Sequence, residues 1–101
     1  CAGVDLVLRK GEVGEIYNIG AGNEFTNLEL TYALLELTGR DESMITWVAD
    51  RLGHDRRYAI DISKATALGW QQTHTFEDGL ASTVKWYTEN RSWWEPLKAK
   101  L

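Results

Sequence analysis

One short stretch of the chain, Ala49 to Asp61, gathers charged and hydrogen-bonding side chains directly after the apolar run Ile45 to Val48. Its arginines and its histidine lie on both sides of Gly53. A glycine lets the backbone turn sharply, so neighbouring side chains and amides can converge on one small target. Because a planar guanidinium can meet two phosphate oxygens at once, this pattern indicates a phosphate-binding loop. The same charges also fit a surface loop held by ion pairs.

The charge of the whole chain disfavours a polyanion as the ligand. The 101 residues carry a formal net charge of -4, whereas a general nucleic-acid-binding protein is normally basic. The positive charge is local, since Asp50 to Arg57 contains three arginines against two aspartates. We therefore expect a small phosphorylated ligand and no nucleic acid.

Composition indicates one globular domain over residues 1–101, with a modest core. Hydrophobic residues make up 44% and charged residues 26% of the chain. A single cysteine, Cys1, excludes an intrachain disulfide, and no apolar run approaches the roughly 20 residues that cross a bilayer. We expect a cytoplasmic protein without membrane contact. The chain begins without methionine, inside an apolar helical pattern, which predicts a fragment of a longer protein.

Other motifs give no catalytic, metal or cofactor site. Gly20 to Phe25 imitates a dinucleotide fingerprint, but Phe25 replaces the small residue that close helix–strand packing requires. A glycine turn is the preferred interpretation. His54 and His74 have no metal-ligand partner at helical spacing, and no nucleophile elbow accompanies any Ser-His-Asp set.

The elements that must position these residues are predicted to be both helices and strands. Helices are expected over residues 1–10, from a Thr26–Glu29 capping box to Gly39, over 64–68, from a Thr75–Asp78 capping signal through Tyr87, and after a Ser92 cap. Strands are expected at 15–19 and 45–48, with a short third at 58–60. The predicted fold class is α/β, a mixture of α and β in one domain.

Several segments, in order and spacing, resemble one enzyme family. They are GEIYNIGAGNEFTNLEL, ADRLGHDRRYAID, LGW, TFEDGL and TVKWY. Together they are similar to the C-terminal part of the dTDP-glucose 4,6-dehydratases, which belong to the extended short-chain dehydrogenase/reductase family. The resemblance covers about Cys1 to Trp94. Related nucleotide-sugar epimerases and dehydratases share LGW and the helix after it, whereas GHDRRYAID favours the dTDP-glucose enzymes.

This resemblance implies the smaller, substrate-binding domain of a two-part enzyme, without its Rossmann domain. In the family the Rossmann domain holds NAD, and the C-terminal domain holds the nucleotide of a dTDP-sugar. The implied reaction is oxidation at sugar C4, loss of water across C5 and C6, and return of the hydride at C6. Its product, dTDP-4-keto-6-deoxyglucose, is a precursor of rhamnose and other deoxysugars.

The resemblance also implies the substrate-binding residues. Arg51 pairs with the diphosphate, His54 adds a hydrogen bond, and Asn27 matches a further substrate-contacting asparagine. The matching segment is completed by Asp50, Leu52 and Gly53, with Leu52 standing where the family commonly has proline.

The family's NAD loop and catalytic residues lie upstream of this chain. None of its four tyrosines is followed by a lysine four residues later, as the family's catalytic pair requires. The chain alone is expected to be inactive and to bind no NAD, while the parent enzyme is expected to be a homo-oligomer. Two alternatives remain: a non-catalytic self-associating module, and the C-terminal part of a related epimerase or dehydratase.

Overall fold

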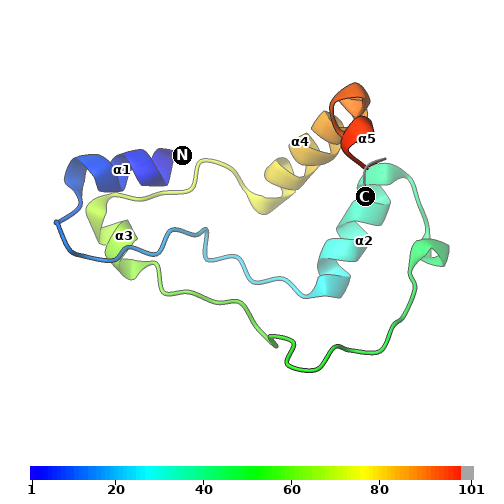
Figure 1. Cartoon of the computed structure of the whole chain (residues 1–101), viewed down its shortest axis with the longest axis horizontal. Helices are drawn as coiled ribbons and strands as arrows, with labels where there is room; N and C mark the ends of the chain where they lie inside the picture. The colour runs from blue at the N-terminus through cyan, green and yellow to red at the C-terminus, as the bar shows by residue number, and fades with distance from the viewer. Residues whose placement is uncertain (99–101) are drawn as a thin grey trace. The chain divides into compact units, whose positions relative to one another are not determined.

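A computed structural model describes residues 1–98, which form helices joined by irregular segments (Figure 1). The five predicted helices are all present. The elements are α1 (Ala2–Lys10), α2 (Asn27–Thr38), the short 3-10 helix η1 (Glu42–Met44), α3 (Ser63–Leu68), α4 (Phe76–Glu89) and α5 (Arg91–Lys98).

Capping explains where the two longest helices begin. The Thr26 hydroxyl accepts a hydrogen bond from the Glu29 amide at 3.2 Å, and the Glu29 carboxylate accepts one from the Thr26 amide at 2.6 Å. This is the predicted capping box, and α2 ends at Gly39 with a left-handed φ of 62°. Thr75 caps α4 by accepting from the Asp78 amide at 3.1 Å. The return bond from Asp78 is not among the hydrogen bonds of residues 1–98.

The predicted Ser92 cap is wrong. Helix α5 already begins at Arg91, so Ser92 lies inside it. The reason is that the Asn90 carbonyl accepts a hydrogen bond from the Trp93 amide at 3.0 Å, while the Asn90 side chain donates to the Trp86 carbonyl at 2.8 Å. Asn90 therefore ends α4 and begins α5 with no linker between them.

The three predicted strands, at 15–19, 45–48 and 58–60, are not formed in the part of the chain that the structure describes. An alternating sequence fixes only which side chains share a face, whereas a strand also needs a neighbour to complete its hydrogen bonds. These segments have no such neighbour within residues 1–98, and their apolar side chains stay exposed, Ile16 and Val48 at 82% each. The α/β class is therefore not confirmed.

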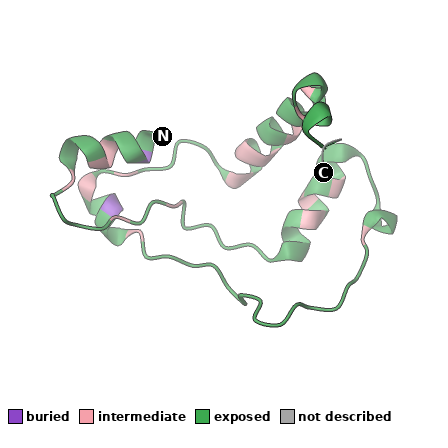
Figure 2. Cartoon of the chain, viewed as in Figure 1, coloured by how far each residue is buried: buried purple, intermediate pink, exposed green. Residues whose placement is uncertain are grey.

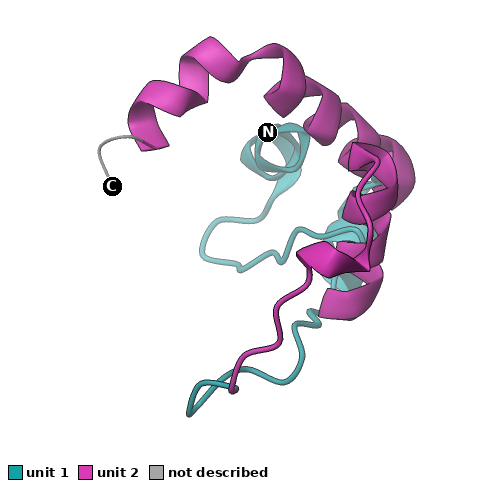
Figure 3. Cartoon of the chain, turned by 90° about the vertical axis from the view of Figure 1, so that its right-hand side faces the viewer, with its two compact units in different colours: residues 1–24, 50–73 teal, residues 25–49, 74–101 magenta. Residues whose placement is uncertain are grey.

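The first of two compact units comprises Cys1–Glu24 and Asp50–Thr73 (Figure 3). Its centre is the contact of α1 with α3, where Gly3 and Ala65 are buried (Figure 2). A Cβ on Gly3 would lie 2.7 Å from Ile19 Cγ2 and 3.3 Å from Trp70 Cζ3, so only glycine permits this approach. The Trp70 indole also donates to the Gly20 carbonyl at 2.7 Å.

The second unit comprises Phe25–Ala49 and His74–Leu101. Helix α4 packs against both α2 and α5. The rings of Phe25 and Phe76, each next to a helix start, stack with centroids 4.0 Å apart. The Trp94 indole donates to the Tyr87 carbonyl at 2.8 Å, which ties α5 to α4.

Burial is much lower than the composition predicts. Within residues 1–98, Gly3 and Ala65 are the buried residues. A compact chain of this length normally buries about two-thirds of its unfolded surface, so the expected modest core is not formed. The prediction of one domain over residues 1–101 stays a prediction.

Candidate functional site

The predicted phosphate-binding stretch, Asp50 to Arg57, is called the 50–57 loop below, and a tight turn lies near its start. The His54 amide donates to the Arg51 carbonyl at 3.3 Å. Gly53 has a φ of +72°, and no other type of residue within 1–98 has a positive φ. A turn with a positive φ only at its third residue is type II, and its second position, here Leu52, favours proline. The resemblance implies proline at this position, and the turn gives a physical reason for it.

Asp50 and His54 meet across this turn. The His54 Nδ1 lies 2.7 Å from the Asp50 Oδ1. An ionised carboxylate only accepts hydrogen bonds, so Nδ1 carries the proton and donates. This hydrogen bond holds the pKa of the Asp50 carboxyl below its usual range. It also orients the imidazole, and among the described residues it is the only hydrogen bond of the ring. Nε2 is therefore the nitrogen that can meet a ligand.

The arginines of the 50–57 loop differ in their partners. Arg57 makes a two-pronged ion pair with Glu24, with Nε to Oε2 at 2.6 Å and Nη2 to Oε1 at 2.7 Å. This pair lowers the pKa of Glu24 and raises that of Arg57. Within residues 1–98 the exposed side chains of Arg51 and Arg56 make no hydrogen bond or ion pair. Neither guanidinium is therefore engaged by a carboxylate within these residues, and that of Arg51 lies at the turn.

Asn27, the sixth predicted site residue, is the first residue of α2. It lies directly after the Thr26 cap, in the second compact unit, whereas the other five lie together in the first (Figure 3). Its carbonyl accepts from the Thr31 hydroxyl at 2.6 Å, and its exposed side chain makes no hydrogen bond within residues 1–98. A helix start presents backbone N–H groups, so the position suits contact with an anionic ligand.

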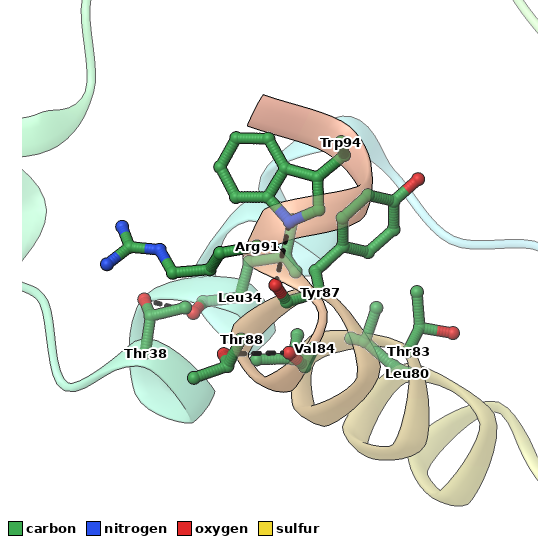
Figure 4. A pocket seen from close by; sticks show the side chains of 9 residues that line it. All are labelled: Leu34, Thr38, Leu80, Thr83, Val84, Tyr87, Thr88, Arg91 and Trp94. Carbon is green, nitrogen blue, oxygen red and sulfur yellow. Dashed lines mark hydrogen bonds between the residues drawn. The ribbon is translucent and has the colours of Figure 1, made fainter. Parts of the chain in front are cut away.

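A pocket of about 500 Å³ in the second unit contains none of these six residues (Figure 4). Apolar side chains of α2, α4 and α5 form most of its wall, including Leu34, Val84 and Trp94. Its three threonine hydroxyls all donate to carbonyls of their own helices. Arg91, its one charged residue, pairs with Glu95 at 3.1 Å. The pocket therefore suits an apolar group and lacks the open cation that a phosphate needs.

Sequence reasoning missed Glu24 as a partner of the 50–57 loop. Glu24 and Arg57 are 33 residues apart, so no local spacing connects them. Glu24 lies in the segment interpreted as a glycine turn, and Gly20 does serve packing there. A Cβ on Gly20 would lie 3.2 Å from Ile60 Cδ1. Opposite charges in two irregular segments were the available signal, and they do not select one pair among many.

Within residues 1–98 no group of three His, Cys, Asp or Glu side chains is placed to hold a metal ion. Over the same residues, none of the helices combines the length and apolar composition needed to span a membrane.

Comparison with known proteins relates nearly the whole chain to one family of enzymes. No protein-family model matches the chain. The dTDP-glucose 4,6-dehydratase of Streptomyces antibioticus is 50% identical over 101 residues, which is 99% of this chain and 30% of that protein. The crystal structure of DesIV, a dTDP-glucose 4,6-dehydratase from Streptomyces venezuelae with NAD and TYD bound, matches with a TM-score of 0.91 and 55% identity. That match covers 96% of this chain and 30% of DesIV.

This chain is similar to the C-terminal part of the dTDP-glucose 4,6-dehydratases. The Bacillus anthracis dTDP-glucose 4,6-dehydratase, solved in complex with NAD, agrees, with a TM-score of 0.89 and 48% identity. A Haloferax volcanii protein named low-salt glycan biosynthesis protein Agl12 is 54% identical over 87 residues. The chain spans about 30% of the length of these dehydratases. The family resemblance predicted from the motifs is thereby confirmed.

Proposed function

We propose that this chain is the substrate-binding part of an NAD-dependent dTDP-glucose 4,6-dehydratase. In this proposal the rest of a longer protein supplies the Rossmann domain, NAD and the catalytic residues. The identity to dehydratases over nearly the whole chain supports the assignment, as does the NAD reported in the DesIV and Bacillus anthracis structures. The proposed setting is a cytoplasmic homo-oligomer that makes dTDP-4-keto-6-deoxyglucose for deoxysugars such as rhamnose.

In that reaction the residues of this chain bind and orient the sugar nucleotide. NAD would supply the hydride chemistry by accepting a hydride at C4 and returning it at C6, while the loss of water across C5 and C6 would be acid–base chemistry of catalytic residues outside this chain. Arg51 binds diphosphate oxygens through its planar guanidinium, and His54 adds a hydrogen bond nearby through Nε2. Asp50 holds the His54 ring, while the Leu52–Gly53 turn brings both side chains to the same diphosphate. Asn27 contacts the nucleotide from the start of α2.

The observation that carries this proposal is the exposed guanidinium of Arg51 at the type II turn, which contacts no carboxylate within residues 1–98. Calorimetric titration of the chain with dTDP tests it. Loss of a charge-assisted hydrogen-bonding group costs about 1.5–3 kcal/mol, so Arg51→Ala should weaken binding about 10- to 100-fold. Arg51→Lys keeps the positive charge but loses the planar guanidinium that can meet two oxygens. Its affinity for dTDP should therefore lie between those of the unaltered chain and of Arg51→Ala. Arg40→Ala, which removes another exposed arginine outside the loop, should bind dTDP normally.

Two results would contradict this assignment. Absence of dTDP binding at millimolar concentration would exclude independent ligand binding by the chain. Tighter binding of a UDP-sugar than of a dTDP-sugar would favour a related nucleotide-sugar epimerase or dehydratase.

A second candidate function, self-association without catalysis, is favoured by the exposed apolar side chains. Val13, Trp47 and Val48 are 104%, 76% and 82% exposed. In this candidate function a second copy of the chain covers such exposed apolar side chains. Sedimentation at several concentrations, with and without dTDP, separates the two. Assembly that dTDP does not affect, without measurable dTDP binding, would favour the self-associating module.

A further inference from the structure

The 50–57 loop has few backbone hydrogen bonds of its own. Among the backbone hydrogen bonds outside helices within residues 1–98, the one in this loop closes the Arg51–His54 turn. The Asp50–His54 contact is also internal to the loop. Among the polar contacts within residues 1–98, the one that ties this loop to a distant segment of the chain is the pair of Arg57 with Glu24. The next such contact, Asn18 to the Asp61 carbonyl at 3.1 Å, lies beyond the loop.

The geometry of this pair fixes an orientation as well as a distance. Two parallel hydrogen bonds, at 2.6 and 2.7 Å, align the guanidinium plane with the carboxylate plane. The backbone at Arg57 is thereby held three residues after His54. A single-point contact would leave the side chain free to rotate about the bond.

We propose that the Glu24–Arg57 pair is a clamp that positions the loop carrying Arg51 and His54 for the diphosphate. This inference rests on the proposed function, in which that loop binds a sugar nucleotide. The clamp acts through Arg51 and His54 and does not touch the ligand, so Glu24 and Arg57 are positioning residues. A loop that is already ordered loses less conformational entropy on binding, which raises its affinity.

Because the side chains of Glu24 and Arg57 are exposed, their role in positioning the loop can be distinguished from a general effect on stability. The side chains of Arg57 and Glu24 are 69% and 48% exposed. Exposed pairs contribute little to the free energy of unfolding because water and salt screen them. Breaking the pair should therefore change ligand affinity much more than the melting temperature.

The test uses the 101-residue chain, dTDP as the probe, and the variant Glu24→Gln, which keeps the shape of the side chain and removes its charge. We expect dTDP to bind about 3- to 10-fold more weakly, with a nearly unchanged melting temperature. Exchange of the His54 amide hydrogen, measured without ligand, should become faster. The reversed pair, Glu24→Arg with Arg57→Glu, should recover affinity. Asp5→Asn breaks a similarly exposed ion pair in the same unit, with Arg9, and is the control.

Each result of the Glu24→Gln experiment either supports the clamp or overturns it. Unchanged or tighter dTDP binding by Glu24→Gln would overturn the clamp, and tighter binding would show that Arg57, once released, contacts the phosphate directly. A loss of affinity matched by Asp5→Asn would also overturn it. If the unaltered chain does not bind dTDP, the proposed function fails, and His54 amide exchange alone decides the clamp. Faster exchange in Glu24→Gln would support it, and unchanged exchange would overturn it.

Discussion

At the scale of single residues, a contact across one turn sets the ionisation of a surface carboxyl. Asp50 accepts a hydrogen bond from His54, and this holds the Asp50 pKa below its usual range. The contact favours the charged carboxylate in the folded chain. It also leaves one imidazole nitrogen for a ligand, so the same hydrogen bond serves both the loop and the proposed site.

This contact predicts a pH dependence. Because the folded-state pKa of Asp50 lies below the unfolded value, its stabilising contribution is present above the unfolded pKa of about 3.9 and is lost as pH falls through the folded-state pKa. Carboxyl ¹³C NMR of the chain and of His54→Ala measures this. The Asp50 pKa should rise in the variant. The pKa of Asp61, lowered by hydrogen bonds from Ser63, should not move. An Asp50 pKa that is the same in both proteins would disprove the coupling.

Sequence spacing was enough to bring five of the six predicted site residues together. Asp50 to His54 are consecutive, so one turn at Gly53 decides their arrangement, and a glycine there is visible in the sequence. Glu24 could not be predicted, because its contact with Arg57 depends on how two irregular segments meet. Local patterns carry no information on such a pairing.

At the scale of elements, helices were predictable because their signals are local. The Thr26–Glu29 capping box and the left-handed Gly39 determine α2 within its own sequence. The Ser92 cap failed because Asn90 provided a nearer helix start. The strands failed for another reason, since a strand requires a partner that residues 1–98 do not provide.

The type II turn gives a prediction at this scale. Leu52→Pro should raise the free energy of unfolding by about 0.4–1 kcal/mol, because proline suits the second turn position and restricts the unfolded chain. Leu52 is 102% exposed, so no packing is lost. Urea denaturation measures the change.

A substitution at the next residue, Gly53, tests the same turn and should change the free energy of unfolding in the opposite direction. Gly53→Ala should lower the free energy of unfolding by about 1–2 kcal/mol, because alanine is unfavourable at φ +72°. An added Cβ there has no atom within 4 Å, so a clash would not contribute. A destabilising Leu52→Pro together with a neutral Gly53→Ala would contradict the turn assignment.

At the scale of the whole molecule, the chain has two small compact units and much uncovered apolar surface. Each unit is held by a few specific contacts, such as Gly3 against Ile19 in one and Phe25 against Phe76 in the other. Composition alone predicted a core because it gives the number of apolar residues. It does not say whether other segments of the chain pack over them. The match to about 30% of the length of the dehydratases fits the proposal that further chain covers this surface.

The central claim is that the 50–57 loop binds the diphosphate of a dTDP-sugar. The most direct measurement is a titration of the ¹⁵N-labelled chain with dTDP, followed by amide chemical shifts, with thymidine as the control that lacks phosphates. We expect the largest dTDP shifts at Arg51 to His54 and at Asn27, and much smaller loop shifts with thymidine. Shifts confined to the α2–α4–α5 pocket, around Val84 and Trp94, would contradict it.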